Sequence, residues 1–510
     1  MKSKFFLGLI LTLSIMMLFV TSYASEPKMG GVLKVVMETS PPTIDTHATG
    51  TTLAFIVGYH IFEGLFTLDE NLKPIPMLAA DLPEISDDKL VYTIKLRPDL
   101  KFHNGKDVTA EDAVASLKRW GKMGTRGKYL FENVDSIEAK DLLTLELKLT
   151  KPTAITLVFL AMPAGGAFIY PKDLCEKYPD KPLEEYIGTG PFKFVEWKPQ
   201  QYIKMVRFDG YKPVEFSANG FGGKKIAYVD EIQFIPILDQ AVRLTSVEGR
   251  EYDFSDFIAC DEYDRLKGIP SIQALPTALR ASYVFFLNKR AGIMREVKIR
   301  EAFLTALDMG PMLAASKGDK AFWRVDPSIV LKESIWWSDI GKEKYNQGDT
   351  EKAKMLLQEA GYKGEEIVWM VSAEYDLSLV AKKQLEKAGF NIDLQSMEFA
   401  TMADRRKNPE LWDVFTTGMT WKPDPSMLTL LNPFYPGWWE SPKFIDLLDK
   451  LATETDFDKR YKVMEEIQEL FYTEVPAIKV GDYGNLRIAA KNVHGFENLN
   501  EPFFWNVWKE

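Results

Sequence analysis

The sequence predicts a mixed α/β protein built from several lobes. Its 510 residues exceed what one hydrophobic core ordinarily holds, and about 150 residues per domain gives roughly three domains. Between residues 350 and 400, helix-like segments alternate with strand-like ones, which is the order of a parallel βαβ unit. With 46% hydrophobic and 13% aromatic residues, the composition is that of a globular protein and excludes intrinsic disorder.

The elements of the first half follow from hydrophobic periodicity and turn residues. A β-branched run over 32–37 predicts a strand, and the apolar spacing over 51–66 predicts a helix that Gly64 ends. Thr109 can cap a helix whose first turn carries two acidic residues. Further strands are expected at 89–96, 142–149, 192–197, 202–208 and 232–238, and a helix at 239–248.

The second half shows the same mixture of elements. A strand is expected at 283–287 and a helix at 295–308. The alternating region comprises a helix at 350–360, a strand at 367–371, a helix at 376–388 and a strand at 391–395. Later come a strand at 414–417, an amphipathic helix at 456–472, and strands at 476–481 and 485–489.

Residues 1–24 fit a secretory signal peptide. Lys2 and Lys4 precede an apolar run over 5–20, and residues 22–24 offer the small side chains that a signal peptidase reads. The run is short for a membrane-spanning helix of about 20 residues. No cysteine lies near the cleavage point, which excludes lipid attachment there. We therefore expect an exported periplasmic protein that is not lipid-anchored.

Charge and composition argue against several classes of function. A net charge of −10 argues against nucleic-acid binding. Two cysteines, Cys175 and Cys260, provide no disulfide framework, and the four histidines lie far apart. The sequence has no G-x-S-x-G, H-E-x-x-H, Walker A or G-x-G-x-x-G motif. We expect no enzyme, cofactor or metal site, although a glycosidase could place two carboxylates anywhere among the 73 acids.

Two loops stand out by their turn chemistry. Gly188 and Gly190 precede Pro191 and can take positive φ or allow a close backbone approach. Trp421 and Asp424 lie on a loop that two prolines stiffen, so little entropy is lost when their side chains meet a ligand. Taken singly, each loop is an ordinary turn.

These landmarks belong to a longer series of short motifs that occur in a fixed order along almost the whole chain. The series lies at 30–33, 42–47, 61–65, 76–80, 92–97, 101–105, 109–112, 188–191, 288, 298–302, 306–308 and 421–425. It resembles the family 5 extracytoplasmic solute-binding proteins, which are peptide, oligopeptide and nickel receptors of ABC importers.

The resemblance implies a type II periplasmic-binding-protein clamshell with an extra subdomain in its N-terminal lobe. The N-terminal lobe is expected at 26–46, 187–283 and 485–510, and the inserted subdomain at 47–186. The C-terminal lobe is expected at 284–484. Hinge strands would lie near 281–288 and 478–487, with the solute held between the lobes and closure as a hinge motion.

The resemblance also implies candidate site residues. In peptide-binding members an Asp three residues after a Trp pairs with the peptide's ammonium group, and here Trp421 is followed by Asp424. The alternative is that Asp424 and Pro425 form only a structural pair that shapes the loop. Arg405 and Arg406 precede the strand at 414–417 and are candidates for the peptide carboxylate, with a solvated basic turn as the alternative.

The expected function is capture of a solute, with a peptide favoured, and its delivery to a membrane ABC permease by a monomeric receptor. An oligosaccharide or another non-peptide solute is the first alternative, because the C-terminal lobe is rich in tryptophans that could offer flat faces to sugar rings: Trp323, Trp336, Trp337, Trp421, Trp438 and Trp439. A secreted glycan hydrolase is the second. The length of the ligand, its affinity, the docking surface and any sensory role stay open.

Overall fold

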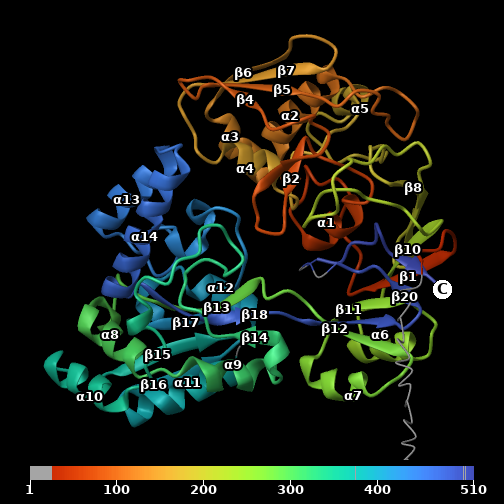
Figure 1. Ribbon diagram of the computed structural model, residues 1–510. Helices are drawn as coiled ribbons and strands as arrows, with labels where there is room; N and C mark the ends of the chain where they lie inside the picture. The colour runs from red at the N-terminus through yellow and green to blue at the C-terminus, as the bar shows by residue number, and fades with distance from the viewer. Residues whose placement is uncertain (1–25, 374, 498, 500) are drawn as a thin grey trace, which may run out of the picture.

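The computed structural model describes residues 26–510 except 374, 498 and 500, and it contains three main β-sheets in separate regions (Figure 1). The predicted signal peptide lies outside the described residues. One sheet has seven strands, one has six, and a smaller one has four. We call the regions built on them the N-terminal lobe, the C-terminal lobe and the inserted subdomain, in that order. The predicted α/β fold with several lobes is confirmed.

The N-terminal lobe contains strands from both ends of the chain. Its sheet has the order β12-β19-β11-β1-β10-β9-β8, in which β1 lies parallel to β10 and β11. Alternating buried apolar positions, such as Leu33 and Val35 in β1, place one face of the sheet against the core. The strands are β1 (Val32–Met37), β8 (Phe192–Lys198), β9 (Tyr202–Arg207), β10 (Glu231–Pro236), β11 (Phe254–Ile258), β12 (Ile272–Pro276) and β19 (Leu486–Ala490).

The C-terminal lobe is one continuous stretch of chain between β12 and β19. Its sheet has the order β14-β18-β13-β17-β15-β16, and α11 (Tyr375–Lys387) leads from β15 to its parallel neighbour β16. The predicted βαβ unit is therefore confirmed. The strands are β13 (Ala281–Leu287), β14 (Trp323–Arg324), β15 (Glu366–Val371), β16 (Asn391–Ser396), β17 (Val414–Thr420) and β18 (Ala477–Tyr483).

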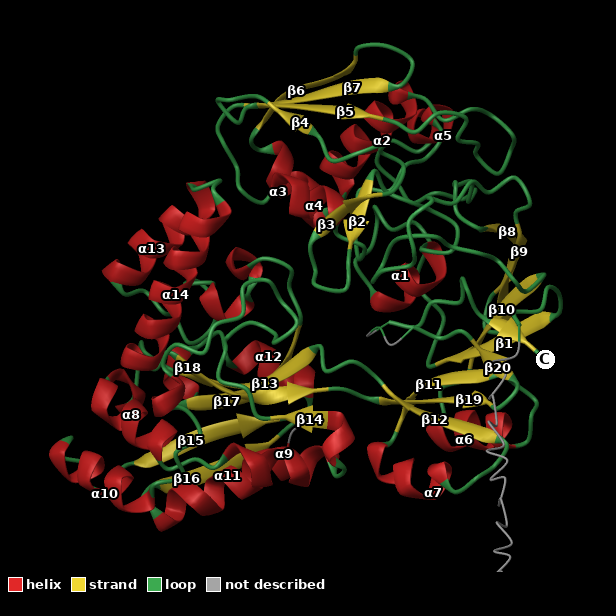
Figure 2. Cartoon of the chain, in the orientation of Figure 1, coloured by secondary structure: helices red, strands yellow, loops and turns green. Residues whose placement is uncertain are grey.

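The inserted subdomain lies at the top of the view and carries the sheet β4-β5-β7-β6, with α2 packed beside it (Figure 2). The predicted helix start at Thr109 is confirmed, because its hydroxyl accepts from the Asp112 N–H while the Asp112 carboxylate accepts from the Thr109 N–H. The strands are β4 (Glu84–Ile85), β5 (Val91–Lys95), β6 (Val134–Ala139) and β7 (Thr144–Leu149).

The remaining elements cover these sheets or link them. Short strands pair as β2 (Phe66–Leu68) with β3 (Pro74–Pro76) and as β20 (Val493–His494) with β21 (Trp508–Lys509). The helices besides α11 are α1 (Thr52–Gly58), α2 (Ala110–Met123), α3 (Thr125–Phe131), α4 (Thr156–Ala161), α5 (Lys172–Lys177), α6 (Gln240–Glu248), α7 (Tyr263–Lys267), α8 (Val297–Thr305), α9 (Met309–Lys317), α10 (Thr350–Glu359), α12 (Phe399–Arg405), α13 (Pro442–Thr453) and α14 (Phe457–Glu474).

The helix predicted over 51–66 is shorter than expected. Helix α1 ends at Gly58, and Gly64 instead forms a β-bridge with Phe168. The apolar residues Ile61, Phe62 and Leu65 are buried in the core. Helix-type turns continue to Phe62, whose N–H donates to the Gly58 carbonyl oxygen at 2.8 Å. From Glu63 onward, pairing with residues near 168 replaces the helical hydrogen bonds that the spacing predicts.

Gly188 and Gly190 let two loops pass very close to each other. A Cβ atom at Gly188 would lie 2.1 Å from the carbonyl oxygen of Ile61, and one at Gly190 would lie 2.4 Å from that of His60. The Gly190 N–H donates to the Ile61 oxygen at 2.9 Å. The glycines are thus required for close approach rather than for positive φ.

The two lobes are joined by two chain segments that run side by side. Residues 277–280 lead from β12 to β13, and residues 484–485 lead from β18 back to β19. The N–H of Thr277 donates to the Asn485 carbonyl oxygen at 2.8 Å, and the Asn485 N–H donates to the Thr277 hydroxyl at 2.8 Å. We propose that these two crossing segments form the hinge. The domain boundaries expected from the sequence also remain a proposal, in which the chain first crosses between the lobes at 277–280.

Across residues 26–510, leaving aside the three undescribed positions, no helix combines the length and the apolar character that crossing a membrane requires.

Candidate functional site

A cavity of about 760 Å³ lies beside the crossing segments, where loops of the two lobes meet. Its wall contains residues 70–71 of the inserted subdomain, and residues 218–220, 276–280, 497 and 499 from the N-terminal lobe and the first crossing segment. The C-terminal lobe contributes Ala321, Arg324 and Glu333. Small-molecule sites in proteins commonly enclose about 300–1,000 Å³ and favour positions between domains. This cavity is therefore the candidate solute site.

The wall on the C-terminal lobe is a network of paired charges. Arg324 donates through Nη2 to Glu333 Oε2 at 2.6 Å and through Nε to Asp482 Oδ2 at 2.8 Å. Asp482 is fully buried and also pairs with Lys479 at 2.8 Å. Burial alone would raise the pKa of Glu333, but its bonds to Arg324 hold that pKa below its usual range. The network fixes Arg324 and Glu333 in place at the cavity.

Arg280 lies on the first crossing segment and is held from several sides. Its carbonyl oxygen accepts from the Trp421 N–H at 2.9 Å, and its Nη2 donates to the Glu70 carbonyl oxygen at 3.1 Å. The guanidinium carbon lies 5.9 Å from the ring centre of Phe221 and 6.0 Å from that of Trp421. Burial lowers the pKa of Arg280, and nearby carboxylates such as Glu501 and Glu333 oppose this shift.

Trp421 forms a direct contact between the lobes. It comes from the loop after β17 and stacks on Phe221 of the N-terminal lobe, with ring centres 5.6 Å apart and an angle of 25° between the rings. The neighbouring side chain, Lys422, is partly buried, and desolvation together with the nearby charge of Arg126 lowers its pKa to about 8, against an opposing effect of Glu501. Trp421 and Lys422 thus belong to the zone where the lobes meet.

Asp424 is buried and already paired. Its two carboxylate oxygens accept from Arg460 Nη1 at 2.8 Å and Nη2 at 3.0 Å. Oδ1 also accepts from the backbone N–H and the hydroxyl of Ser426, which caps the turn at Pro425–Met427. A doubly bonded guanidinium occupies the positions that a ligand ammonium would need. The arrangement is the one expected if Asp424 shapes the loop.

Arg405 and Arg406 lie at the end of α12, in the C-terminal lobe. The Arg406 guanidinium carbon lies 5.5 Å from the ring centre of Phe415 and 5.1 Å from that of Tyr435. Among described residues, the wall of the 760 Å³ cavity includes none of the four predicted site residues; Trp421 contacts Arg280, which does line it. A ligand role for Asp424, Trp421, Arg405 and Arg406 stays a prediction.

Most of the tryptophans considered for sugar stacking serve as packing. Trp336, Trp438 and Trp439 are between 3% and 7% exposed and belong to the core of the C-terminal lobe. Trp336 also donates through Nε1 to the Pro423 carbonyl oxygen at 3.1 Å. These rings have no free face on which a sugar could stack.

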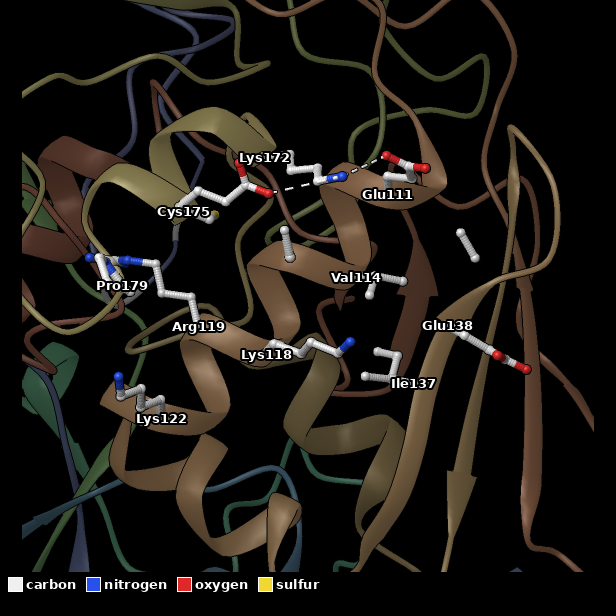
Figure 3. A pocket seen from close by; sticks show the side chains of 13 residues that line it. Glu111, Val114, Lys118, Arg119, Lys122, Ile137, Glu138, Lys172, Cys175 and Pro179 are labelled. Carbon is white, nitrogen blue, oxygen red and sulfur yellow. Dashed lines mark hydrogen bonds and ion pairs between the residues drawn. The ribbon is translucent and has the colours of Figure 1, made fainter.

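A second hollow of about 560 Å³ lies on the outside of the inserted subdomain, between α2 and β6 (Figure 3). Two of its cations are already paired: Lys172 bonds to Glu111 at 2.9 Å, and Arg119 bonds to the buried Asp45 at 2.6 Å. All of its described lining comes from one subdomain, so lobe movement would not enclose a solute there.

Sequence reasoning missed Arg280, Arg324 and Glu333. Arg324 belongs to the two-residue strand β14, Glu333 follows nine residues later in an irregular stretch, and Arg280 directly precedes β13. Their common position at one cavity depends on how the lobes pack, which no local pattern encodes. The one usable signal was the position of Arg280 directly before the predicted hinge strand.

The family model "Bacterial extracellular solute-binding proteins, family 5 Middle" matches residues 73–440. A probable peptide ABC transporter periplasmic-binding protein of Sinorhizobium fredii is 28% identical, with 88% of each chain covered. The oligopeptide-binding protein AppA of Bacillus subtilis is 25% identical, covering 95% of this chain and 92% of AppA. The glutathione-binding protein GsiB of Pectobacterium atrosepticum is 24% identical, covering 91% and 90%.

Solved structures show the same fold. The substrate-binding protein CtaP of Listeria monocytogenes superimposes with a TM-score of 0.83 at 21% identity, covering 94% of this chain and 100% of CtaP. AppA of Bacillus subtilis, solved in complex with a nonapeptide, gives a TM-score of 0.71 at 21% identity, covering 95% and 100%. Both likenesses extend over both lobes and the inserted subdomain.

Proposed function

Because this chain belongs to the bacterial extracellular solute-binding proteins of family 5, we propose that it captures a short peptide between its lobes and delivers it to an ABC permease. Members of this family are transport receptors and not enzymes, which removes the secreted hydrolase from consideration. Membership in the family gives the chain the role of a solute receptor. That the solute is a peptide, that it is delivered to a permease and that the receptor is a monomer are our proposals.

The cavity at the crossing segments is the observation that carries the proposal. Its wall carries charged residues of both signs. The cations are Arg280 and Arg324, and the anions are Glu70, Glu333 and Glu497. A peptide is a zwitterion with backbone donors and acceptors, so such a wall offers partners to both of its ends. Relatives named for peptide, oligopeptide and glutathione binding support the same class of solute.

Within this proposal Asp424 acts as a loop-shaping residue. Its pairing with Arg460 leaves no oxygen unengaged, and a second cation could bind only by displacing a buried guanidinium. Trp421 acts at the contact between the lobes, beside Arg280. The oligosaccharide alternative loses its main argument, because the tryptophans of the C-terminal lobe that were considered are mostly packed into the core.

We also propose that the protein works outside the cytoplasmic membrane after removal of residues 1–24. The relative from Sinorhizobium fredii is named as a periplasmic-binding protein, and the pattern of the first residues fits export. Closure would then be a movement of the lobes about the crossing segments at 277–280 and 484–485. A solute can drive it only through contacts that form with both lobes in the closed state.

A thermal-shift panel tests the proposal on the chain without its first 24 residues. The panel contains di- to pentapeptides, the same peptides N-acetylated, glutathione, and neutral oligosaccharides. Ligand at 100 times its dissociation constant adds about 2.7 kcal/mol of stability, which gives a measurable rise in Tm. We expect free peptides to raise the Tm. A shift with oligosaccharides alone would replace the peptide with a sugar, and the receptor role would stand.

A further inference from the structure

Arg280 differs from Arg324, the other arginine of the cavity wall, in having side-chain donors that make no hydrogen bond within the described part of the chain. The Arg324 guanidinium donates to Glu333 and to Asp482. Arg280 is 4% exposed, yet its Nε and Nη1 have no hydrogen-bond partner within the described part of the chain. Its one side-chain hydrogen bond there is that from Nη2 to Glu70.

Nearby acids balance the charge of Arg280 without satisfying its donors. The carboxylates of Glu501, Glu333, Glu70 and Asp69 all interact with it electrostatically. None of them accepts a hydrogen bond from Nε or Nη1. A buried donor without an acceptor is costly, and the cost falls away when an acceptor enters the site. Arg280 therefore lines the cavity and carries two buried donors that no group of the described chain uses.

The position of Arg280 fixes its orientation before any ligand arrives. Contacts with Phe221 and Trp421 lie on its sides, and the bond to the Glu70 carbonyl anchors Nη2. Because Nη2 carries a second hydrogen beside Nη1, a carboxylate can accept from both nitrogens at once. Such a preformed fork loses little side-chain entropy on binding.

We propose that Arg280 binds a carboxylate of the transported solute and thereby selects anionic or zwitterionic ligands over neutral ones. This proposal rests on the receptor function proposed above and names the chemistry that the cavity recognises. Since Arg280 lies on a crossing segment and contacts Trp421 of the C-terminal lobe, the bound carboxylate lies at the point where the lobes turn against each other. Arg280 would then take part both in recognising the solute carboxylate and in the closure of the lobes.

Calorimetric titration of the wild-type protein with matched ligands tests the role of Arg280. Each peptide that raises the Tm is compared with its C-terminal amide, and a sugar acid is compared with the corresponding neutral sugar. We expect the loss of the carboxylate to weaken binding by about 10- to 100-fold, as for a hydrogen bond to a charged group. This comparison needs no variant, so it does not depend on how a variant folds.

Variants then assign the effect to Arg280. In Arg280→Gln the ratio between the dissociation constants of amide and free acid should fall to near 1, and Arg280→Lys should restore part of it because the charge returns without the fork. Arg290→Gln is the matched control: Arg290 is an exposed arginine of the C-terminal lobe that pairs with Glu440. The control should keep the wild-type ratio.

The outcomes separate the two proposals. Equal affinity for free and amidated peptides overturns the carboxylate role of Arg280 and leaves the peptide receptor standing. Binding of sugar acids but not of neutral sugars or peptides supports Arg280 and overturns the peptide. Binding of neutral oligosaccharides alone, or no saturable binding in any arm, counts against both.

Discussion

Buried carboxylates near the cavity are engaged by cations of the chain itself. Asp424 is closed off by Arg460, and Asp482 is shared among Lys479, Arg324 and the Ser282 hydroxyl, which donates at 2.8 Å. At this scale a residue's function depends on whether its hydrogen-bonding capacity is already used. By that measure Asp424 organises its loop, whereas Arg280 still has donors for a ligand.

Arg460→Met should lower the free energy of unfolding by about 3–5 kcal/mol, because it leaves the buried Asp424 carboxylate without its cation. Chemical denaturation of the protein without ligand measures the change. Arg290→Met serves as the control, since the exposed pair of Arg290 with Glu440 should contribute about 1 kcal/mol or less. Equal losses in the two variants would show that Asp424 does not depend on Arg460.

Lys422 should make the free energy of unfolding depend on pH. Its pKa is about 8 in the folded chain, whereas a lysine in the unfolded chain has the ordinary value of 10.5. Between these pH values the unfolded chain therefore binds more protons than the folded chain. The free energy of unfolding of the wild type should therefore rise with pH in this range relative to Lys422→Met, by at most about 1.4 kcal/mol per pH unit. Denaturation series at pH 7, 8, 9 and 10 measure this difference.

The control for Lys422 is Lys128→Met, at an exposed lysine of the inserted subdomain. The difference in the free energy of unfolding between the wild type and Lys128→Met should show no comparable rise above pH 8. A flat difference for Lys422→Met as well would mean that Lys422 is solvated in the folded protein.

At the scale of elements, the loop at 188–191 joins the inserted subdomain to the N-terminal lobe through backbone approach. Gly188 and Gly190 lie against the carbonyl groups of Ile61 and His60, the segment that follows α1. The same segment is where the predicted helix ends early. Helix-type hydrogen bonds continue only as far as that from the Phe62 N–H to the Gly58 carbonyl oxygen, at 2.8 Å. Beyond it the chain is held by strand-like pairing and by the glycine loop.

Gly190→Ala should destabilise the protein by about 1–3 kcal/mol or more, because its Cβ would lie 2.4 Å from the His60 carbonyl oxygen. Thermal unfolding measures the loss. Gly50→Ala is the matched control, since a Cβ at Gly50 would meet no atom within 4 Å. If Gly190→Ala unfolds like the control, the two loops can separate without loss.

Many of the helices and strands could be predicted from the sequence. Local signals predicted β1, the capped start of α2 at Thr109 and the β15-α11-β16 unit, because periodicity and capping depend on near neighbours. They failed for 59–66, where pairing with distant residues decides the conformation. The solute site depends still more on distant contacts: Arg280 and Glu333 meet only after the lobes pack, so no spacing in the sequence brings them together.

In the whole molecule the two lobes touch at several places, one of which is the contact of Tyr263 with Phe322, whose ring centres lie 5.0 Å apart. Trp421 of the C-terminal lobe belongs to the hydrophobic core of the N-terminal lobe, where it stacks on Phe221. On another side, the Ala154 N–H of the inserted subdomain approaches the Ala452 carbonyl oxygen of α13 at 3.5 Å. These contacts bias the lobes toward each other before a solute adds its own contacts.

Trp421→Ala should open the unliganded protein and increase its radius of gyration in small-angle scattering. Phe221→Ala should have the same effect, and the double variant should open little further, because the two substitutions remove one contact. Ligand at saturation should reduce the difference from the wild type. Unchanged scattering of both single variants would mean that the lobes are held together elsewhere.

The paths of the outer strands have a mechanical consequence. The strands β1 and β19 both border β11 in one sheet, and Lys509 Nζ donates to the Val32 carbonyl oxygen at 3.0 Å. A pulling force applied at residues 32 and 509 would therefore load the seven-stranded sheet first. Residues 281–483 would bear no tension until β19 had been stripped from its neighbours. In a single-molecule stretching experiment the C-terminal lobe should extend only after β19 has detached, even if the lobe is unstable by itself.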